Sequence, residues 1–335
     1  MHAQSNPFRR LQACARPAWR GAGLLACALL SLPQAALAQD YPSKPLRIVT
    51  IEVGGGNDSI ARTLAQGLTT GLGQQVLVEN RGGASGVIAV ETVSKAAPDG
   101  YTLLSLSGSM WTLPFMQNVP YDPVRDFAPI SLTVSAPNIL VIHPDVPAKN
   151  VRELIAHAKT RPGQLNYSTA GSGSAGHLSA ELFKAMAGLD IVRVSYKGGG
   201  PAMTDLIAGR VQLSFTSAAS SLAHVKSGKL RALAVTSAKP SEIAPGIPPV
   251  ASEGLPGYEL ISTYGFFAPA KTPAAIINRL HQETVKALNT PDIKARFFKG
   301  GSEIVASSPQ EFAAVIKSDQ AKLGKLIKDA GITID

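Results

Sequence analysis

The stretch LRIVTIEVGGGNDSIARTLAQGL, residues 46–68, decides the fold class. Its first part, residues 46–51, is a continuous run of apolar and β-branched residues, which is typical of a strand buried on both faces. The loop Gly54-Gly55-Gly56 ends this run, and Asp58 or Ser59 can cap the helix that follows. Because a second strand pattern begins at Gln75, the order strand, helix, strand predicts a parallel unit with a right-handed crossover.

The same alternation continues through the rest of the chain. Further strand patterns lie at residues 101–107, 165–169, 191–196, 211–215 and 230–236. Two other apolar runs, residues 138–143 and 261–268, can each carry the chain from one lobe to the other. We therefore predict an α/β fold of two doubly wound lobes joined by a two-crossing hinge. Lobe 1 is expected at residues 39–142 and 263–335, and lobe 2 at residues 143–262.

The first 38 residues have the pattern of a cleavable signal peptide. A basic start with Arg9, Arg10, Arg16 and Arg20 precedes a short apolar run at residues 21–32. The small residues of Ala36-Leu37-Ala38 then supply a cleavage site. The apolar run is shorter than the roughly 20 residues that span a bilayer. We expect residues 1–38 to be removed and the rest of the chain to be exported to the periplasm.

Removing this leader changes the charge and the chemistry of the chain. The leader carries four of the 32 Lys and Arg residues and none of the 23 Asp and Glu residues, so the net charge falls from +9 to +5. This modest surplus is spread along the chain, which argues against nucleic-acid binding. Both cysteines, Cys14 and Cys27, also leave with the leader. Disulfides, thiolate catalysis and cysteine metal sites are therefore not expected.

Three loops rich in glycine or hydroxyl residues follow predicted strands. They are Gly54-Gly55-Gly56, residues 105–109 and residues 169–174. Open α/β sheets bind ligands beyond the carboxyl ends of their strands, and helix N-termini there favour negative charge. The loops therefore predict an anion pocket of amides and hydroxyls that suits a carboxylate. The alternative is that each loop is only a tight turn between a strand and a helix.

The enzyme motifs in the chain are weak. Gly171, Gly173 and Gly176 fit the G-x-G-x-x-G spacing of an NADP-dependent oxidoreductase, but no acidic residue stands at the end of the next strand. No serine lies in a strict G-x-S-x-G elbow, although His177 is near Ser172 and Ser174 in sequence. The other histidines lack ligand spacing. We expect no catalysis, no cofactor and no metal.

Several ordered motifs make the chain resemble a known family of binding proteins. The match runs from residue 41 to the C-terminus, and its markers include Gly54-Gly55-Gly56, residues 78–81, residues 97–103, Tyr121-Asp122-Pro123, Tyr196-Lys197-Gly198 and residues 228–236. The chain is similar to the substrate-binding proteins of tripartite tricarboxylate transporters, the Bug family. This resemblance implies a type II periplasmic-binding-protein fold that closes on its ligand.

The resemblance also implies partners and ligand contacts. The expected partners are a small carboxylic acid, mono- or dicarboxylic and possibly aromatic, and the large and small membrane subunits of a secondary carrier. A monomer is expected, and a membrane sensor in place of the carrier is the alternative. Carried over by position, the expected ligand contacts are Val53, Gly54, Gly55, Gly56, Asn57, Ser107, Ser109, Met110, Thr169, Ala170, Ser172, Gly173, Ser174, His177, Thr216 and Ser217. Asp58 is expected to cap a helix beside this site.

Two departures from the family pattern affect the expected ligand. Residues 50–53 replace a proline-rich segment, and the carboxylate of Glu52 would oppose a second ligand carboxylate unless it turns to solvent. Thr216 and Ser217 stand where the family commonly has Asp-Asn, which removes a partner for a ligand amine. Met110 and Trp111 can add an apolar wall. We expect a plain carboxylate in preference to an amino acid.

Overall fold

The computed structural model describes residues 41–51, 53–54, 56–196 and 198–334, and residues 42–335 form one compact unit. Several expectations lie outside the described residues: the signal peptide at residues 1–38, the role of Glu52, the ligand contact of Gly55 and the motif residue Lys197.

One part of the structure is a sheet whose first strands are parallel, as the opening stretch predicts. Strand β1 pairs with both β2 and β3, and β9 continues the sheet antiparallel to β3. The strands of this part are β1 (Leu46–Thr50), β2 (Val76–Asn80), β3 (Thr102–Ser107), β9 (Ile261–Pro269) and the short β10 (Glu303–Ile304). Its helices are α2 (Gly56–Leu72), α3 (Val87–Ser94), α4 (Ser109–Thr112), α9 (Ala274–Leu288), α10 (Pro291–Lys299) and α11 (Pro309–Asp329). The sequence patterns did not predict α10 or the single turn α4.

The other part is built around a second parallel set of strands. Strand β5 pairs in parallel with β6 on one side and with β7 on the other. The strands are β5 (Asn166–Thr169), β6 (Val192–Ser195), β7 (Leu213–Ser217) and β8 (Arg231–Val235). The helices are α5 (Val151–Lys159), α6 (Ala175–Ala187), α7 (Gly199–Ile207) and α8 (Ala218–Lys226). Each helix connects successive strands or leads into the first of them.

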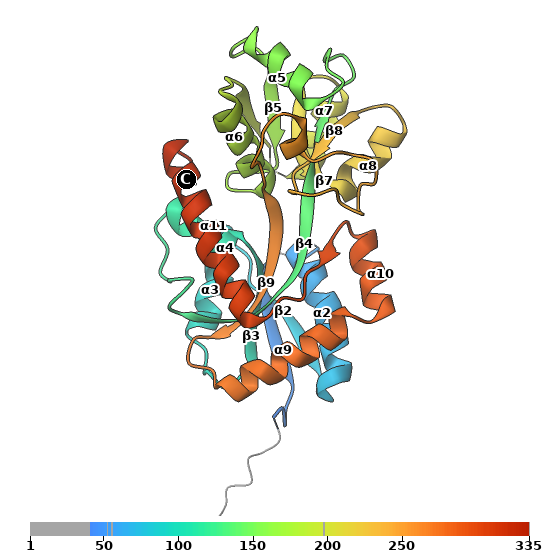
Figure 1. Ribbon diagram of the computed structural model, residues 1–335. Coiled ribbons are helices and arrows are strands. Elements are labelled where there is room, and N and C mark those ends of the chain that lie inside the picture. The colour runs from blue at the N-terminus through green and yellow to red at the C-terminus, as the bar shows by residue number, and fades with distance from the viewer. Residues whose placement is uncertain (1–40, 52, 55, 197, 335) are drawn as a thin grey trace, which may run out of the picture. The chain divides into compact units, whose positions relative to one another are not determined.

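Two long segments connect these parts, β9 and β4 (Phe127–Ile142). Residues 127–137 of β4 pair with β9, whereas residues 138–142 pair with β7 on one side and β8 on the other. In Figure 1, β4 and β9 run from the group of helices around α2 and α9 to the group around α5 and α7. The two predicted crossings are therefore present.

Strand β4 begins eleven residues before the predicted apolar run. Its first half was not predicted because hydroxyl residues interrupt the apolar pattern there. Ser131 and Thr133 are fully buried and donate side-chain hydrogen bonds to the carbonyls of Ser307 and Tyr264, at 2.8 and 2.9 Å. A buried hydroxyl that finds a backbone acceptor costs little, so the sequence need not be apolar there. These contacts also tie β4 to the segment before α11.

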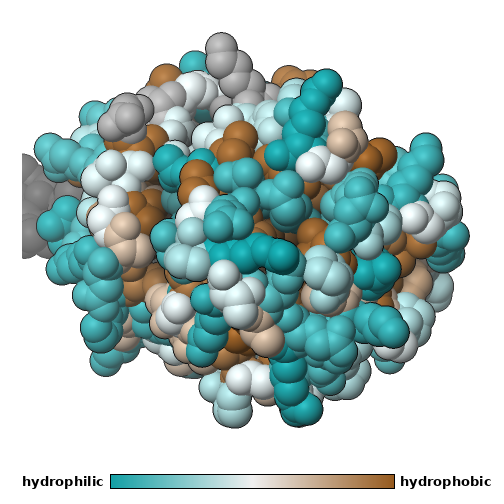
Figure 2. All heavy atoms as spheres, turned by 90° about the horizontal axis from the view of Figure 1, so that it is seen from above, coloured by the Kyte–Doolittle hydropathy of each residue, from teal (hydrophilic) through white to brown (hydrophobic). Residues whose placement is uncertain are grey.

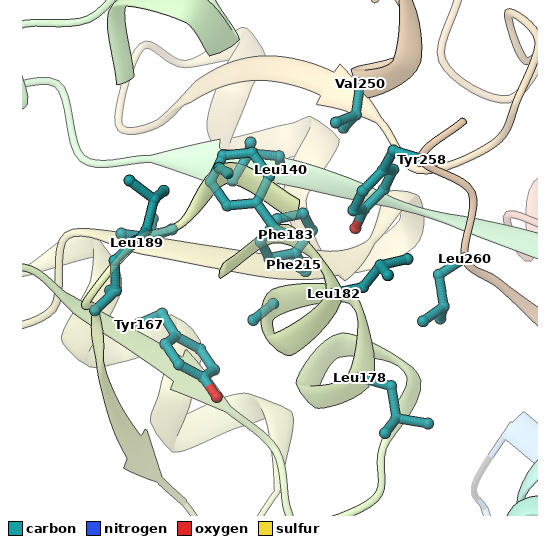
Figure 3. Packing of buried hydrophobic residues seen from close by; sticks show 14 of the residues in the cluster. Leu140, Tyr167, Leu178, Leu182, Phe183, Leu189, Phe215, Val250, Tyr258 and Leu260 are labelled. Carbon is teal, nitrogen blue, oxygen red and sulfur yellow. The ribbon is translucent and has the colours of Figure 1, made fainter. Parts of the chain in front are cut away.

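Aromatic packing organises the core around β7 and α6. Phe183, Phe215 and Tyr258 form a close cluster, with ring centroids 5.6 to 6.5 Å apart, and the Tyr258 hydroxyl donates to the carbonyl of Ser179. Figure 3 shows this cluster together with Leu178 and Leu260. Both leucines also line the pocket described below. The core thus supports one wall of that pocket.

Helix α11 starts at a capping box, in which Ser308 and Glu311 satisfy each other's backbone N–H groups. It packs on β4 and α4, and its later residues Leu323, Leu326 and Ile327 belong to the hydrophobic cluster of the second sheet. The helix therefore contacts both parts of the structure. The lobe boundaries predicted at residues 142 and 263 stay a prediction.

The surface shows no concentration of apolar side chains in the view of Figure 2. Hydrophilic residues cover most of this face, and hydrophobic residues lie scattered among them. Within the described ranges, no helix combines the length and the hydropathy that crossing a bilayer requires.

Candidate functional site

A pocket of about 550 Å³ lies between loops of the two sheets. Its size falls within the range of small-molecule sites, about 300–1,000 Å³. The lining residues come from the loops after β1, β3 and β5, from β9 and from α11: Ile51, Asn57, Ser85, Ser107, Gly108, Ser109, Trp111, Thr112, Leu113, Met116, residues 170–175, Leu178, residues 260–264, Asp319, Leu323 and Ile334.

The wall contributed by the first sheet is fixed by hydrogen bonds. The amide of Ser107 donates to Oδ1 of Asn57 at 2.8 Å, which ties the end of β3 to the first turn of α2. The hydroxyls of Ser107 and Ser109 lie 2.9 Å apart, and the amide of Gly108 donates to the carbonyl of Thr263. This part of the pocket therefore presents hydroxyls held at set positions.

The loop after β5 forms the opposite wall and uses several of its own polar groups internally. Ser174 is the N-cap of α6, because its hydroxyl accepts the amide of His177 and also donates to the carbonyl of Gly171. Thr169 donates its hydroxyl to that carbonyl at 2.8 Å. Among the described residues the amide of Ser172 has no partner. The Ser172 hydroxyl oxygen accepts a hydrogen bond from the Arg193 guanidinium at 3.4 Å, so its own proton stays free to donate. What remains open to a ligand is the Ser172 amide, this hydroxyl proton and the positive end of α6.

His177 holds this loop in place beneath the pocket surface. The side chain is buried, and its Nδ1 accepts the amide of Gly173 at 3.0 Å, while Nε2 lies 3.0 Å from a guanidinium nitrogen of Arg193. Burial and the charge of Arg193 lower the pKa of His177 to about 4. A neutral imidazole has one unprotonated nitrogen, here Nδ1, and a second proton on the ring would remove this acceptor and place a positive charge beside Arg193. His177 orients the loop and does not line the pocket.

Packing explains two of the three glycines whose spacing suggests a nucleotide site, Gly173 and Gly176. A Cβ on Gly176 would lie 2.3 Å from the carbonyl oxygen of Phe215, so α6 needs a glycine to approach β7. Gly173 has a φ of +71°, and Met116 and Ile334 occupy the space where its Cβ would point. Gly176 therefore lets the backbone of α6 approach that of β7, and Gly173 lets the loop after β5 pack against Met116 and Ile334.

A third wall comes from β9, α4 and α11. The Tyr264 hydroxyl lies where a Cβ on Gly56 would meet it at 3.2 Å, and within the described part of the chain it has no hydrogen-bond partner. Burial raises the pKa of Tyr264. Nearby, Nε1 of Trp111 donates to Oδ2 of Asp319 at 3.0 Å, which brings a carboxylate to the pocket.

The structure brings part of the predicted ligand set to this pocket. The predicted residues that line it are Asn57, Ser107, Ser109, Ala170, Ser172, Gly173 and Ser174. These residues line the cavity, and their contact with a ligand stays a prediction.

The other predicted contacts lie outside this lining. Val53 is 73% exposed, and Met110 is buried in the core of the first sheet. Gly54 donates its amide to Asp58, Gly56 faces Tyr264, and Thr169 and His177 lie under the loop. Thr216 is paired with Ile139 in the sheet, and Ser217 is the N-cap of α8. Strand pairing therefore involves Thr216, and helix capping involves Ser217, both of which were predicted as ligand contacts.

The role predicted for Asp58 as a helix cap is wrong. Helix α2 begins at Gly56, so Asp58 lies within the first turn. Its buried carboxylate accepts hydrogen bonds from Arg62, Asn80 and the amide of Gly54. The bond from Arg62 contributes most to lowering the pKa of Asp58 to about 2, despite burial. Asp58 stabilises the loop after β1 through this network.

Sequence reasoning found Trp111 and missed the rest of the third wall. Tyr264, Asp319, Leu323 and Ile334 are far from the strand-end loops in sequence, and no motif marks them. Asp319 lies on an amphipathic helix, where an acidic residue is typical of a solvated face. Trp111 was predicted as a wall residue and lines the pocket, but its neighbour Met110 does not.

We also considered a second hollow and a metal site. A hollow of about 860 Å³ lies beside α10, lined by Pro240, Glu242 and residues 302–306 among others, but none of the strand-end loops reaches it. Among the residues whose positions are described, no group of three or more His, Cys, Asp or Glu side chains is placed to hold a metal ion.

A pocket between two doubly wound sheets, joined by two crossing strands, defines the class of two-lobed solute-binding proteins. The chain matches the model of the Tripartite tricarboxylate transporter family receptor over residues 60–332, and it belongs to this family.

Relatives in sequence and in structure agree with this membership. Protein BugT of Bordetella pertussis is 35% identical over 298 residues, which cover 88% of this chain and 91% of BugT. The structure of R. palustris Rpa4515 with adipate has a TM-score of 0.76 at 34% identity and covers 88% of this chain and 99% of that one. The periplasmic binding protein BugD has a TM-score of 0.73 at 32% identity, with the same coverage. The predicted fold class and family are confirmed.

Proposed function

We propose that this protein is a periplasmic receptor that captures a small carboxylic acid between its two lobes and delivers it to a tripartite tricarboxylate-type membrane carrier. The observation that carries the proposal is the pocket itself, which joins hydroxyls of the first sheet to the N-terminus of α6 in the second. A ligand that contacts both walls would hold the lobes together. Such a ligand couples binding to closure.

The chemistry of the walls supports a carboxylate. Ser107 and Ser109 offer hydroxyl donors on one side, and Ser172 with the first turn of α6 offers donors on the other. A helix N-terminus and hydroxyl groups bind carboxylates without a cationic side chain. The adipate bound to a relative that is 34% identical supports the same class of ligand.

The leader pattern and the family support export and delivery to a carrier. The predicted signal peptide supports a periplasmic location, and the family description supports a carrier as the partner. A receptor that presents its ligand to a membrane sensor is the second candidate, and a pull-down with detergent-solubilised carrier subunits would separate the two. We infer a non-catalytic role, since the pocket supplies binding groups and its histidine is used to hold a loop.

Titration calorimetry on the mature protein, residues 39–335, tests the proposal with adipate, succinate and benzoate. At least one should bind saturably with a Kd below about a millimolar. Ser107→Ala and Ser172→Ala, one from each wall, should each weaken binding by about fivefold, because each removes one hydrogen bond. Ser227→Ala removes a hydroxyl outside the pocket and should leave Kd unchanged. If none of the three acids binds saturably, the proposal is contradicted.

A further inference from the structure

The pocket contains a carboxylate of its own, supplied by Asp319 from the middle of α11. Nε1 of Trp111 donates to Oδ2 of Asp319 at 3.0 Å, and the second oxygen, Oδ1, has no partner among the described residues. Of the described residues that line the pocket, Asp319 alone has an acidic or basic side chain. One group therefore sets the formal charge of the described pocket lining.

The surroundings of Asp319 leave this charge largely uncompensated. Burial raises the pKa of Asp319, an effect opposed by the hydrogen bond from Trp111. Two other charged groups face it: Lys322, one turn further along α11, lowers the pKa, and Glu259, before β9, raises it. The ammonium of Lys322 donates to the backbone carbonyl of Glu259 at 2.7 Å. Lys322 therefore has its hydrogen bond outside the pocket.

The pocket thus contains polar groups of two kinds. The loop after β5 and the N-terminus of α6 attract negative charge, whereas the free oxygen of Asp319 accepts hydrogen bonds. A ligand carboxylate fits the donors of the loop and of α6. A ligand group that reaches Asp319 meets an acceptor, which a hydroxyl or ammonium group satisfies and an ionised carboxylate does not.

We propose that Asp319 determines specificity, so that the pocket prefers a carboxylate bearing a hydroxyl or ammonium group at its far end. This inference rests on the proposed function and sharpens it, and it departs from the expectation of a ligand without an amine, because Asp319 offers the acidic partner that Thr216 and Ser217 do not. A dicarboxylate binds at the same place only together with one proton, shared between its second carboxylate and Asp319. Its affinity therefore rises as the pH falls, while the affinity of the donor-bearing ligands does not.

Probes of matched length separate these cases: adipate, 6-hydroxyhexanoate and 6-aminohexanoate, with the corresponding four-carbon set of succinate, 4-hydroxybutyrate and 4-aminobutyrate. By calorimetry at about pH 8, within at least one set, a donor-bearing probe should bind about tenfold more tightly than the dicarboxylate. Lowering the pH to about 6 should narrow this ratio. Calorimetry in buffers of different ionisation enthalpy should show the dicarboxylate taking up close to one proton.

Asp319→Asn keeps the shape of the side chain and the acceptor for Trp111, and it adds N–H donors. In this variant, the dicarboxylate should gain affinity and lose its pH dependence. Asp329→Asn makes the same charge change on α11 outside the pocket and should behave as wild type. The proton uptake of the wild-type protein is measured without any variant, so the inference stays testable if Asp319→Asn does not fold.

The outcomes separate the inference from the proposed function. If adipate or succinate binds as tightly as its matched probes, without proton uptake, the role of Asp319 is wrong and carboxylate binding stands. If Asp319→Asn leaves the order of affinities unchanged, the role of Asp319 is also wrong. If no probe of either set binds to the wild-type protein, the inference fails together with the proposed function.

Discussion

Individual polar residues around the pocket act mainly on one another. His177 accepts from Gly173, Asn57 accepts from Ser107, and Ser174 caps α6. Each of these side chains fixes a backbone segment that lines the pocket. A pocket whose donors are held before the ligand arrives loses less conformational entropy on binding. At the residue scale, the site is therefore a set of positioned amides and hydroxyls.

His177 makes the stability of the protein depend on pH. Its pKa in the folded state, about 4, is below the ordinary value of 6.5, so the unfolded chain binds the proton more readily. The free energy of unfolding should therefore fall as the pH decreases from about 7 to about 5, by about 1 to 2 kcal/mol from this group. Urea unfolding at these two pH values measures the change.

His177→Gln removes this group and should reduce the dependence, of which His157, whose pKa is also lowered by burial, keeps a part, whereas the same change at His224, on α8, should leave the dependence as in the wild type. Asp58 and Glu79, whose pKa values are lowered, lose their contribution only below their ordinary values of 3.8 and 4.5. They do not interfere in the chosen range. An equal slope in wild type and His177→Gln would contradict the assigned role.

Elements meet at the pocket because of close packing between helices and strands. Helix α6 approaches β7 at Gly176, where the carbonyl of Phe215 leaves no room for a Cβ. Helix α11 spans both parts of the structure and carries Asp319 and Leu323 to the pocket. The position of these helices on their sheets therefore decides which groups face the ligand.

Gly176→Ala should destabilise the protein by about 1 to 3 kcal/mol, because the added methyl group would push α6 away from β7. Gly200→Ala is the matched control, since it also lies in a helix, α7, and its Cβ meets open space. The control should be neutral or more stable by up to about 1 kcal/mol. Thermal unfolding of both variants measures this difference, and equal melting temperatures would count against the packing account.

Sequence reasoning predicted the elements better than the site. The parallel strand, helix, strand unit at the start and the two crossings follow from apolar runs in the sequence, which the buried core imposes directly. Strand β4 was predicted too short, since its buried hydroxyls are satisfied by backbone carbonyls that only the tertiary structure brings near. The loops after β3 and β5 were located because strand ends meet at one edge of a sheet. Asp319 and Tyr264 depend on long-range packing, which no local pattern reports.

At the scale of the whole molecule, two sheets that share β4 enclose a pocket to which both contribute. Binding would draw the walls together through hydroxyls on one side and a helix N-terminus on the other. This arrangement agrees with the receptor family to which the chain belongs. The central claim is that a small carboxylate binds between these walls.

A crystal structure with the tightest-binding probe from calorimetry tests that claim most directly. We predict that the ligand carboxylate lies within hydrogen-bond distance of Ser172 or the first turn of α6, and that the same molecule contacts Ser107 or Ser109. Its other end should face Asp319. A ligand found instead in the hollow beside α10, or one that contacts only one sheet, would contradict this account.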